Sequence, residues 1–167
     1  MNYPLSGADK EENFNQIYEH FVNDIYSLCF SFMKNTPDTE DAVQETFIRL
    51  YQSNKEFESE KHLYGWLIVT ASNLCKDQLK SWWQKRKSLD EIDETIGREQ
   101  DIDEMMELIM KLPDRYKTII FLYYYEGYNS AEIADLLHKS KGTVRWYLKK
   151  ARELLKAELQ GGYVDGK

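Results

Sequence analysis

Closely spaced cations and a tryptophan near the C-terminus are the residues of this chain best suited to chemistry, namely contact with a polyanion. Between residues 139 and 156 the sequence holds seven Lys or Arg residues against one acid. A helical stripe of apolar residues recurs in the same segment, at Val144, Leu148, Ala151 and Leu155. With that stripe buried, the opposite face of the helix presents Gly142, Arg145, Trp146, Lys149, Lys150 and Glu153.

A shorter predicted helix, residues 130–137, precedes this one and is opened by the capping pair Asn129 and Glu132. Two short helices joined by a tight turn, the second of them basic, have the proportions of a helix-turn-helix. A generic helical hairpin would give the same periodicity, but it would seldom expose Trp146 among lysines. We therefore favour DNA binding over a purely structural hairpin.

Separate contacts with DNA can be assigned along the basic helix. Arg145 and Lys149 lie one turn apart, which suits contact with phosphates or guanine edges in a major groove. The first turn has free backbone amides and the positive end of the helix dipole, which attract a phosphate to Ser140, Lys141 and Thr143. We expect Ser140 also to cap this helix.

Charge is arranged along the chain in four blocks, acidic, basic, acidic and basic, within a net charge of −7. Residues 61–87 carry six basic residues against one acidic residue, and residues 88–107 carry nine acidic residues against one basic residue. Two basic stretches separated by an acidic one indicate two surfaces that face polyanions. Ordinary solvated helix faces are the alternative, and charge alone favours that alternative.

Three further helices are predicted upstream, because apolar residues recur at helical spacing there. The first buries Phe14, Ile17, Tyr18, Phe21, Ile25, Leu28 and Phe32. The second, with Thr36 as cap, Pro37 in its first turn and Asp38 near its dipole, buries Val43, Phe47 and Leu50. The solvent-facing side of this second helix carries Asp41, Gln44, Glu45, Ile48, Arg49 and Gln52. The third buries Leu63, Trp66, Leu67, Thr70, Ala71 and Leu74.

The predicted organisation is all-α, with two small helical domains joined by an acidic linker. The domains span residues 13–87 and 104–160, the linker spans 88–103, and tails occupy 1–12 and 161–167. No segment alternates over strand length. Gly127 is expected to follow a helix in the left-handed conformation.

Composition argues against several functional classes. Cys29 and Cys75 are too few for a disulfide framework or a metal cluster, and we expect both to be reduced core residues. The three histidines show no ligand spacing, and no phosphate-binding glycine loop or nucleophile motif is found, so no enzyme, metal or cofactor is predicted. No apolar run is long enough to span a membrane, and no secretory signal is found, so a cytoplasmic protein is expected.

Motifs in both halves of the chain resemble bacterial sigma-70 family factors. Region 4 of that family is similar to LPDR at 112–115, EGYNSAEIA at 126–134, GTVR at 142–145 and KAR at 150–152. Region 2 is similar to DAVQETF at 41–47, YGWL at 64–67 and ASN at 71–73. Because only these two regions are found, with a short linker, the chain resembles an extracytoplasmic-function (group 4) sigma factor.

The resemblance implies a promoter-specificity subunit that binds RNA polymerase core at the clamp and flap of its largest subunits. Contact with the clamp is implied for Asp41, Gln44, Glu45, Ile48 and Arg49. Contact with the −10 element and the melted strand is implied for Asn73, Lys76, Lys80 and Trp83. Contact with the −35 element is implied for Ser140, Lys141, Thr143, Arg145, Trp146, Lys149 and Lys150. Family members are also commonly held by a cognate anti-sigma protein, often membrane-bound.

Two departures from the family pattern bear on promoter choice. The helix-turn-helix turn contains His138 and Lys139 where the family usually has Gly and an apolar residue. The third predicted helix contains Ile68 and Val69 where the family commonly has a basic residue. His adopts a positive φ less easily than Gly, so this turn is expected to be strained or differently shaped. The alternative function is a free-standing helix-turn-helix regulator with a sensory N-terminal domain, for which the helix containing residues 41–52 would be irrelevant. The acidic linker is either a nucleic-acid mimic inside polymerase channels or a solubilising connection.

Overall fold

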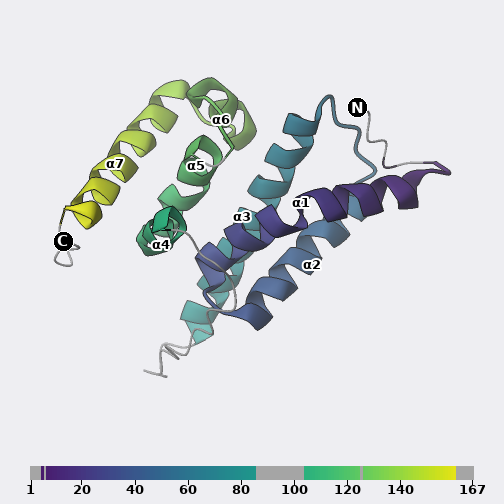
Figure 1. Ribbon diagram of the computed structural model, residues 1–167, viewed down its shortest axis with the longest axis horizontal. Helices are drawn as coiled ribbons and strands as arrows, with labels where there is room; N and C mark the ends of the chain where they lie inside the picture. The colour runs from purple at the N-terminus through teal and green to yellow at the C-terminus, as the bar shows by residue number, and fades with distance from the viewer. Residues whose placement is uncertain (1–4, 6, 86–103, 125, 161–167) are drawn as a thin grey trace. The chain divides into compact units, whose positions relative to one another are not determined.

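A computed structural model of the chain describes residue 5 and residues 7–85, 104–124 and 126–160 (Figure 1). These residues form the helices α1 (Lys10–Met33), α2 (Thr36–Ser53), α3 (Glu60–Lys85), α4 (Glu104–Lys111), α5 (Asp114–Tyr124), α6 (Ser130–Leu137) and α7 (Lys141–Leu159). The described residues contain no strand, and the predicted all-α fold is confirmed. The helices divide into two compact units, residues 1–99 and 100–167. The predicted linker, residues 88–103, and the tail from 161 lie outside the described residues.

The first unit is a three-helix bundle in which α1, α2 and α3 each pack on the other two (Figure 1). Most of the stripe predicted for α1 is buried, but Phe14 is half-buried and Tyr18 is 40% exposed. Tyr18 lies at the edge of the bundle, with its ring edge-on to Phe47 at 4.9 Å between centroids. It therefore adds an aromatic side chain to the surface rather than to the core.

The connection from α1 to α2 corrects the predicted cap, because Asn35 caps α2 and Thr36 does not. Lys34 ends α1 in the left-handed conformation, and Asn35 follows with the extended φ of −151° and ψ of 155°. Its side-chain oxygen accepts a hydrogen bond from the Asp38 amide at 3.0 Å. Since a cap needs an extended backbone, the conformation imposed by the end of α1 selects the earlier residue.

Helix α3 buries a different face from the predicted one. Leu63, Leu67 and Ala71 are buried as expected, but the other three predicted residues, Trp66, Thr70 and Leu74, are only partly buried. Buried in addition are Tyr64, Ile68, Ser72 and Cys75. The buried face extends to these positions because α3 packs on both α1 and α2. Ile68, one of the departures from the family pattern, is therefore a core residue.

The two cysteines lie in the core of this bundle, Cys29 on α1 and Cys75 on α3, and both are free thiols. A hydrogen bond with the Cys75 thiol, together with burial, raises the pKa of the Cys29 thiol well above its usual range. A buried thiol that stays protonated is a poor nucleophile. Cys29 therefore packs as a small apolar side chain.

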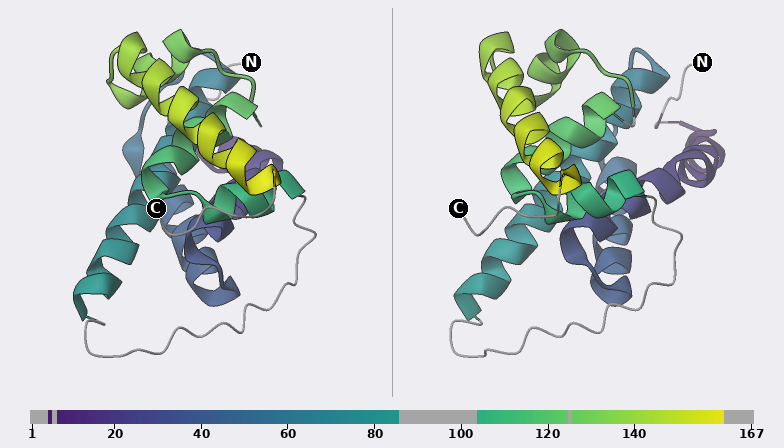
Figure 2. Two further views of the ribbon diagram at one scale, coloured as in Figure 1. Left: turned by 90° about the vertical axis from the view of Figure 1, so that its left-hand side faces the viewer. Right: turned by 60° about the vertical axis from the view of Figure 1, so that its left-hand side comes forward.

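The second unit is arranged around α5, which packs on α4, α6 and α7 (Figure 2). The stripe predicted for α7 is confirmed, since Val144, Leu148, Ala151 and Leu155 are all buried. The capping pair before α6 is also confirmed: the Glu132 amide donates to Asn129 at 2.9 Å, and the Asn129 amide donates to the Glu132 carboxylate at 3.1 Å. Gly127 has the expected positive φ, +68°.

The turn between α6 and α7 contains the other departure from the family pattern, His138 and Lys139. His138 takes a left-handed conformation, with φ 54° and ψ 44°, at the end of α6. The Lys139 amide donates to the Ala134 carbonyl at 2.9 Å and the His138 amide to the Asp135 carbonyl at 3.4 Å, which is the hydrogen-bond pattern of a Schellman motif. The Lys139 ammonium lies 5.9 Å from the Tyr147 ring centroid. The turn thus keeps helix-ending geometry with His in place of Gly.

Candidate functional site

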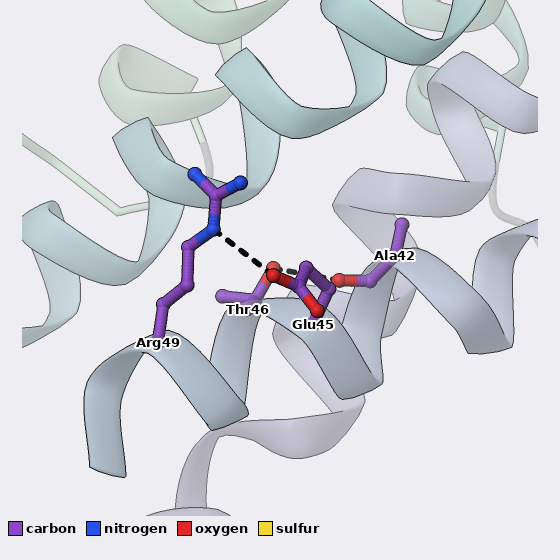
Figure 3. A network of polar contacts seen from close by, with 4 residues as sticks. All are labelled: Ala42, Glu45, Thr46 and Arg49. Carbon is purple, nitrogen blue, oxygen red and sulfur yellow. Dashed lines mark hydrogen bonds and ion pairs between the residues drawn. The ribbon is translucent and has the colours of Figure 1, made fainter. Parts of the chain in front are cut away.

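The outer face of α2 carries the five residues predicted to bind polymerase, and all five are exposed: Asp41, Gln44, Glu45, Ile48 and Arg49. Figure 3 shows two hydrogen bonds within this helix. Arg49 Nε donates to Glu45 Oε1 at 3.2 Å, and the buried Thr46 hydroxyl donates to the Ala42 carbonyl at 2.8 Å. Ile48 is 46% exposed between charged neighbours. A face on which acids outnumber basic residues, with one exposed apolar side chain, suits a protein partner better than DNA.

An aromatic cluster that the sequence did not predict adjoins this face. Tyr51, one turn beyond Ile48, is 40% exposed and lies edge-on to Phe14 at 5.2 Å between centroids. The Lys10 ammonium lies 4.2 Å from the Tyr51 ring centroid and donates to Asn54 at 3.0 Å. Helices α1 and α2 therefore share a surface on which Tyr18, Ile48 and Tyr51 are exposed and Phe14 is half-buried. A sequence signal was available only for Tyr51, which lies three residues from Ile48.

Helix α3 places the residues predicted for the −10 element along one face, at Asn73, Lys76 and Lys80. Asn73 and Lys80 are exposed, and Lys76 is partly buried. Asp77 is exposed on the same part of the helix. The side chain of Trp83 and residues 86–87 lie outside the described part of the chain.

The outer face of α7 is cationic, and the residues predicted for the −35 element lie on it. All seven are exposed: Ser140, Lys141, Thr143, Arg145, Trp146, Lys149 and Lys150. Ser140 accepts a hydrogen bond from the Thr143 amide at 3.1 Å, which makes it the cap of α7 as predicted. The first turn of α7 has no acid and begins with Lys141, so its charge opposes the helix dipole. A bound phosphate would offset that unfavourable arrangement.

Arg152 is an exposed residue of this cationic helix that contacts tyrosines of α5. Its guanidinium lies 4.9 Å from the Tyr123 ring centroid. A hydrogen bond with Tyr124 raises the pKa of Arg152. Arg152 thus attaches α7 to α5. Arg145, Lys149 and Lys150 lie on the outer face together with Glu153, whose carboxylate is 3.7 Å from the Lys150 ammonium.

Neither a metal centre nor a membrane span is found where the structure can be described. Within residues 7–85, 104–124 and 126–160, no three His, Cys, Asp or Glu side chains are grouped so that they could hold a metal ion. In the same ranges, no helix combines the length and apolar character needed to cross a membrane.

Comparison with known proteins covers both units of the chain. Residues 17–91 match the family model described as Sigma-70 region 2, and residues 102–155 match the one described as Sigma-70, region 4. The ECF RNA polymerase sigma factor SigW of Bacillus subtilis (strain 168) is 30% identical, over 90% of this chain and 90% of its own length.

Two solved structures share the fold of the chain. The sigma factor RpoE of Bartonella quintana, in complex with the anti-sigma factor NepR, aligns with a TM-score of 0.70 at 19% identity, over 91% of this chain and 99% of its own. CnrH, in complex with the cytosolic domain of CnrY, aligns with a TM-score of 0.64 at 19% identity, over 92% and 91%. At this identity the likeness concerns the fold alone.

Proposed function

Because the chain belongs to the sigma-70 family, in the extracytoplasmic-function group of RNA polymerase sigma factors, we propose which of its surfaces carry the function. The chain is a transcription initiation factor, and members of this family are not enzymes. We assign the binding of polymerase core to the outer face of α2, the binding of the −10 element to α3 and the binding of the −35 element to α7. The observation that carries this assignment is the contrast between an acidic face with an exposed apolar side chain on α2 and a cationic face on α7.

Polymerase binding by α2 is supported by the exposure of Ile48 between polar neighbours. A few buried anchors dominate most protein interfaces, and an apolar side chain that is free to be covered can serve as one. Asp41, Gln44, Glu45 and Arg49 would form the polar rim around it. The adjoining cluster of Phe14, Tyr18 and Tyr51 would extend the same contact onto α1.

Promoter contact is divided between two helices that present different chemistry. On α3, Asn73 would select a base of the opened −10 element, while Lys76 and Lys80 would hold phosphates of the single strand. On α7, the N-terminal turn would fix a phosphate, and Arg145 and Lys149 would reach base edges or phosphates of duplex −35 DNA. The side chain proposed for stacking, Trp83, lies outside the described residues.

We also propose a cognate anti-sigma protein as a partner and the cytoplasm as the compartment. The proposal draws on the two proteins of the same fold whose solved complexes contain NepR and the cytosolic domain of CnrY. A free-standing regulator is disfavoured, because the N-terminal unit matches Sigma-70 region 2 rather than a sensory domain.

Reconstitution with core polymerase tests the assignment. We expect the full chain to co-elute with core enzyme in gel filtration and to direct transcription from a subset of fragments of the source organism's genomic DNA. Sequencing of the transcripts would then give paired −10 and −35 elements. No complex with core polymerase, or transcripts that share no upstream element, would overturn the proposal.

A further inference from the structure

Trp146 occupies the centre of the outer face of α7. It lies between Val144 and Leu148 in sequence, so at 3.6 residues per turn it points away from the stripe that they bury. Its side chain is 51% exposed, more than any other aromatic residue among those described. A Cβ added to Gly142, one turn earlier, would meet only the Ser140 hydroxyl, at 4.0 Å. No side chain at position 142 therefore covers the helix face next to the indole.

The indole belongs to a series of aromatic contacts that reaches the core. The Trp146 ring lies edge-on to Tyr147 at 5.3 Å between centroids, and Tyr147 lies edge-on to Tyr116 at 5.6 Å. Tyr116, on α5, is only 4% exposed. The Lys150 ammonium lies 5.8 Å from the Trp146 ring centroid. An exposed ring held in this way loses little conformational freedom when it binds a ligand.

The neighbours of Trp146 indicate what the ring would meet. Arg145, Lys149 and Lys150 flank it, and such side chains contact phosphates and the polar edges of bases. The apolar group that duplex DNA presents in the major groove is the C5-methyl of thymine. An indole at the centre of a cationic helix face matches a methyl group that lies between polar base edges.

We propose that Trp146 is a specificity-determining residue that packs against a thymine C5-methyl group in the −35 element. The inference rests on the proposed contact of α7 with the −35 element and adds the chemical group that Trp146 recognises, the C5-methyl of a thymine. Packing of the indole on the DNA backbone, or on another protein, is a different hypothesis that the test below separates from this one.

Replacement of thymine by deoxyuridine removes the methyl group and leaves base pairing intact. The probes are synthetic promoters taken from the transcripts selected with core polymerase, with each −35 thymine, on either strand, replaced in turn. With the wild-type chain we expect transcription to fall about fourfold at one A·T pair, the effect of one buried methyl group. Other A·T pairs of the element should change little.

Variants then connect that methyl group to Trp146. We expect Trp146→Ser to lower transcription from the thymine promoter and to abolish the difference between thymine and deoxyuridine, whereas Trp146→Phe should retain part of it. Lys149→Ala is the matched control, because it should weaken both promoters equally and leave their ratio unchanged. Circular dichroism and thermal unfolding would verify that each variant is folded.

Several outcomes would overturn the inference while leaving the proposed function intact. They are selected −35 elements without a required A·T pair, no deoxyuridine effect at any pair, and a deoxyuridine effect that persists in Trp146→Ser. An equal loss in Trp146→Ser across all −35 sequences would also overturn it and would indicate contact with the backbone or with a protein. Wild-type transcription that ignores the −35 sequence altogether would instead remove the proposed role of α7.

Discussion

Helices α2 and α7 have nearly equal lengths, 18 and 19 residues, and both begin with a side-chain cap, yet their charges are arranged in opposite ways. Helix α2 has Asp38 in its first turn, where an acid stabilises the helix dipole. Helix α7 has Lys141 there and no acid. The first-turn acid of α2 thus stabilises the helix without a ligand, whereas the first-turn lysine of α7 favours the binding of a phosphate at the N-terminus of that helix. The same local fold is thus compatible with the protein contact proposed for α2 and with the DNA contact proposed for α7.

The two helices also differ in the apolar side chain at the centre of the exposed face. Ile48 adjoins Tyr51 and, through α1, an exposed aromatic cluster, so an apolar partner could bury a continuous area. Trp146 is flanked by cations and is supported from below by Tyr147. A large apolar patch suits a protein interface, and a single ring among cations suits a groove lined with phosphates.

The largest effect is expected from placing a charge at the centre of the α2 face. Ile48→Asp would bury an unpaired carboxylate against polymerase, so we expect affinity for core enzyme to fall by about 2–4 kcal/mol, the range of interface hot spots. Binding can be measured by fluorescence anisotropy with labelled protein. Leu159→Asp is the control, because Leu159 is 69% exposed and lies at the end of α7. Equal losses in the two variants would remove α2 from the interface.

A smaller effect is expected when one cation is removed from α7. Arg145→Ala should weaken −35-dependent transcription by about 1–3 kcal/mol if the guanidinium contacts a base edge. Binding of core polymerase should not change, which would separate α7 from α2. Lys156→Ala removes an exposed cation from the last turn of the same helix and should have little effect. If both variants behave alike, α7 contributes only general positive charge.

Base selection by α3 is expected to have a more modest effect. Asn73→Ala should lower discrimination at one −10 position by about 1 kcal/mol, the typical net value of one hydrogen bond. Transcription from promoters with randomised −10 elements would measure it. Asp77→Ala, one turn further along α3 and also exposed, is the control. A uniform loss on all promoters would argue that Asn73 has a structural role.

The exposed faces of α2 and α7 could be predicted from the sequence because helical periodicity alone determines which side of a helix is buried. The caps of α6 and α7 were predictable for a similar reason, since Asn129, Glu132 and Ser140 act on backbone groups within three residues. The cap of α2 was not, because Thr36 and Asn35 are both good caps by residue type. The backbone conformation after Lys34 decides between them.

Contacts between distant residues could not be predicted. The buried face of α3 depends on two helices packing against it, so the single stripe predicted from periodicity omitted Ile68 and Cys75. The support of Trp146 by Tyr147 and Tyr116 joins residues 30 positions apart in sequence. No local pattern relates Tyr116 to Trp146, so the sequence indicated an exposed indole but not its aromatic contacts.

The smallest effect is expected from adding one negative charge to each cap. Aspartate is as good a cap as serine or asparagine, so Ser140→Asp and Asn35→Asp should keep the capping hydrogen bonds. Each adds a charge near a helix N-terminus, and we expect Ser140→Asp to raise the free energy of unfolding of the free protein by about 0.3–1 kcal/mol at low salt. The gain from Asn35→Asp should be smaller, because the Asn35 amide also donates a hydrogen bond to the Met33 carbonyl at 3.0 Å and a carboxylate cannot. Urea denaturation can measure this gain, which should shrink at high salt because the charges are screened.

The same pair of variants separates helix stability from DNA contact. Ser140→Asp should repel the phosphate that is proposed to lie at the first turn of α7, so −35-dependent transcription should fall although the protein becomes more stable. Asn35→Asp adds the same charge to the cap of α2 and should leave transcription unchanged, because no phosphate is assigned there. Unchanged transcription with Ser140→Asp would mean that no phosphate approaches this turn. In that case Lys141, in the first turn of α7, would destabilise the helix through its dipole, and DNA binding would not offset that loss of stability.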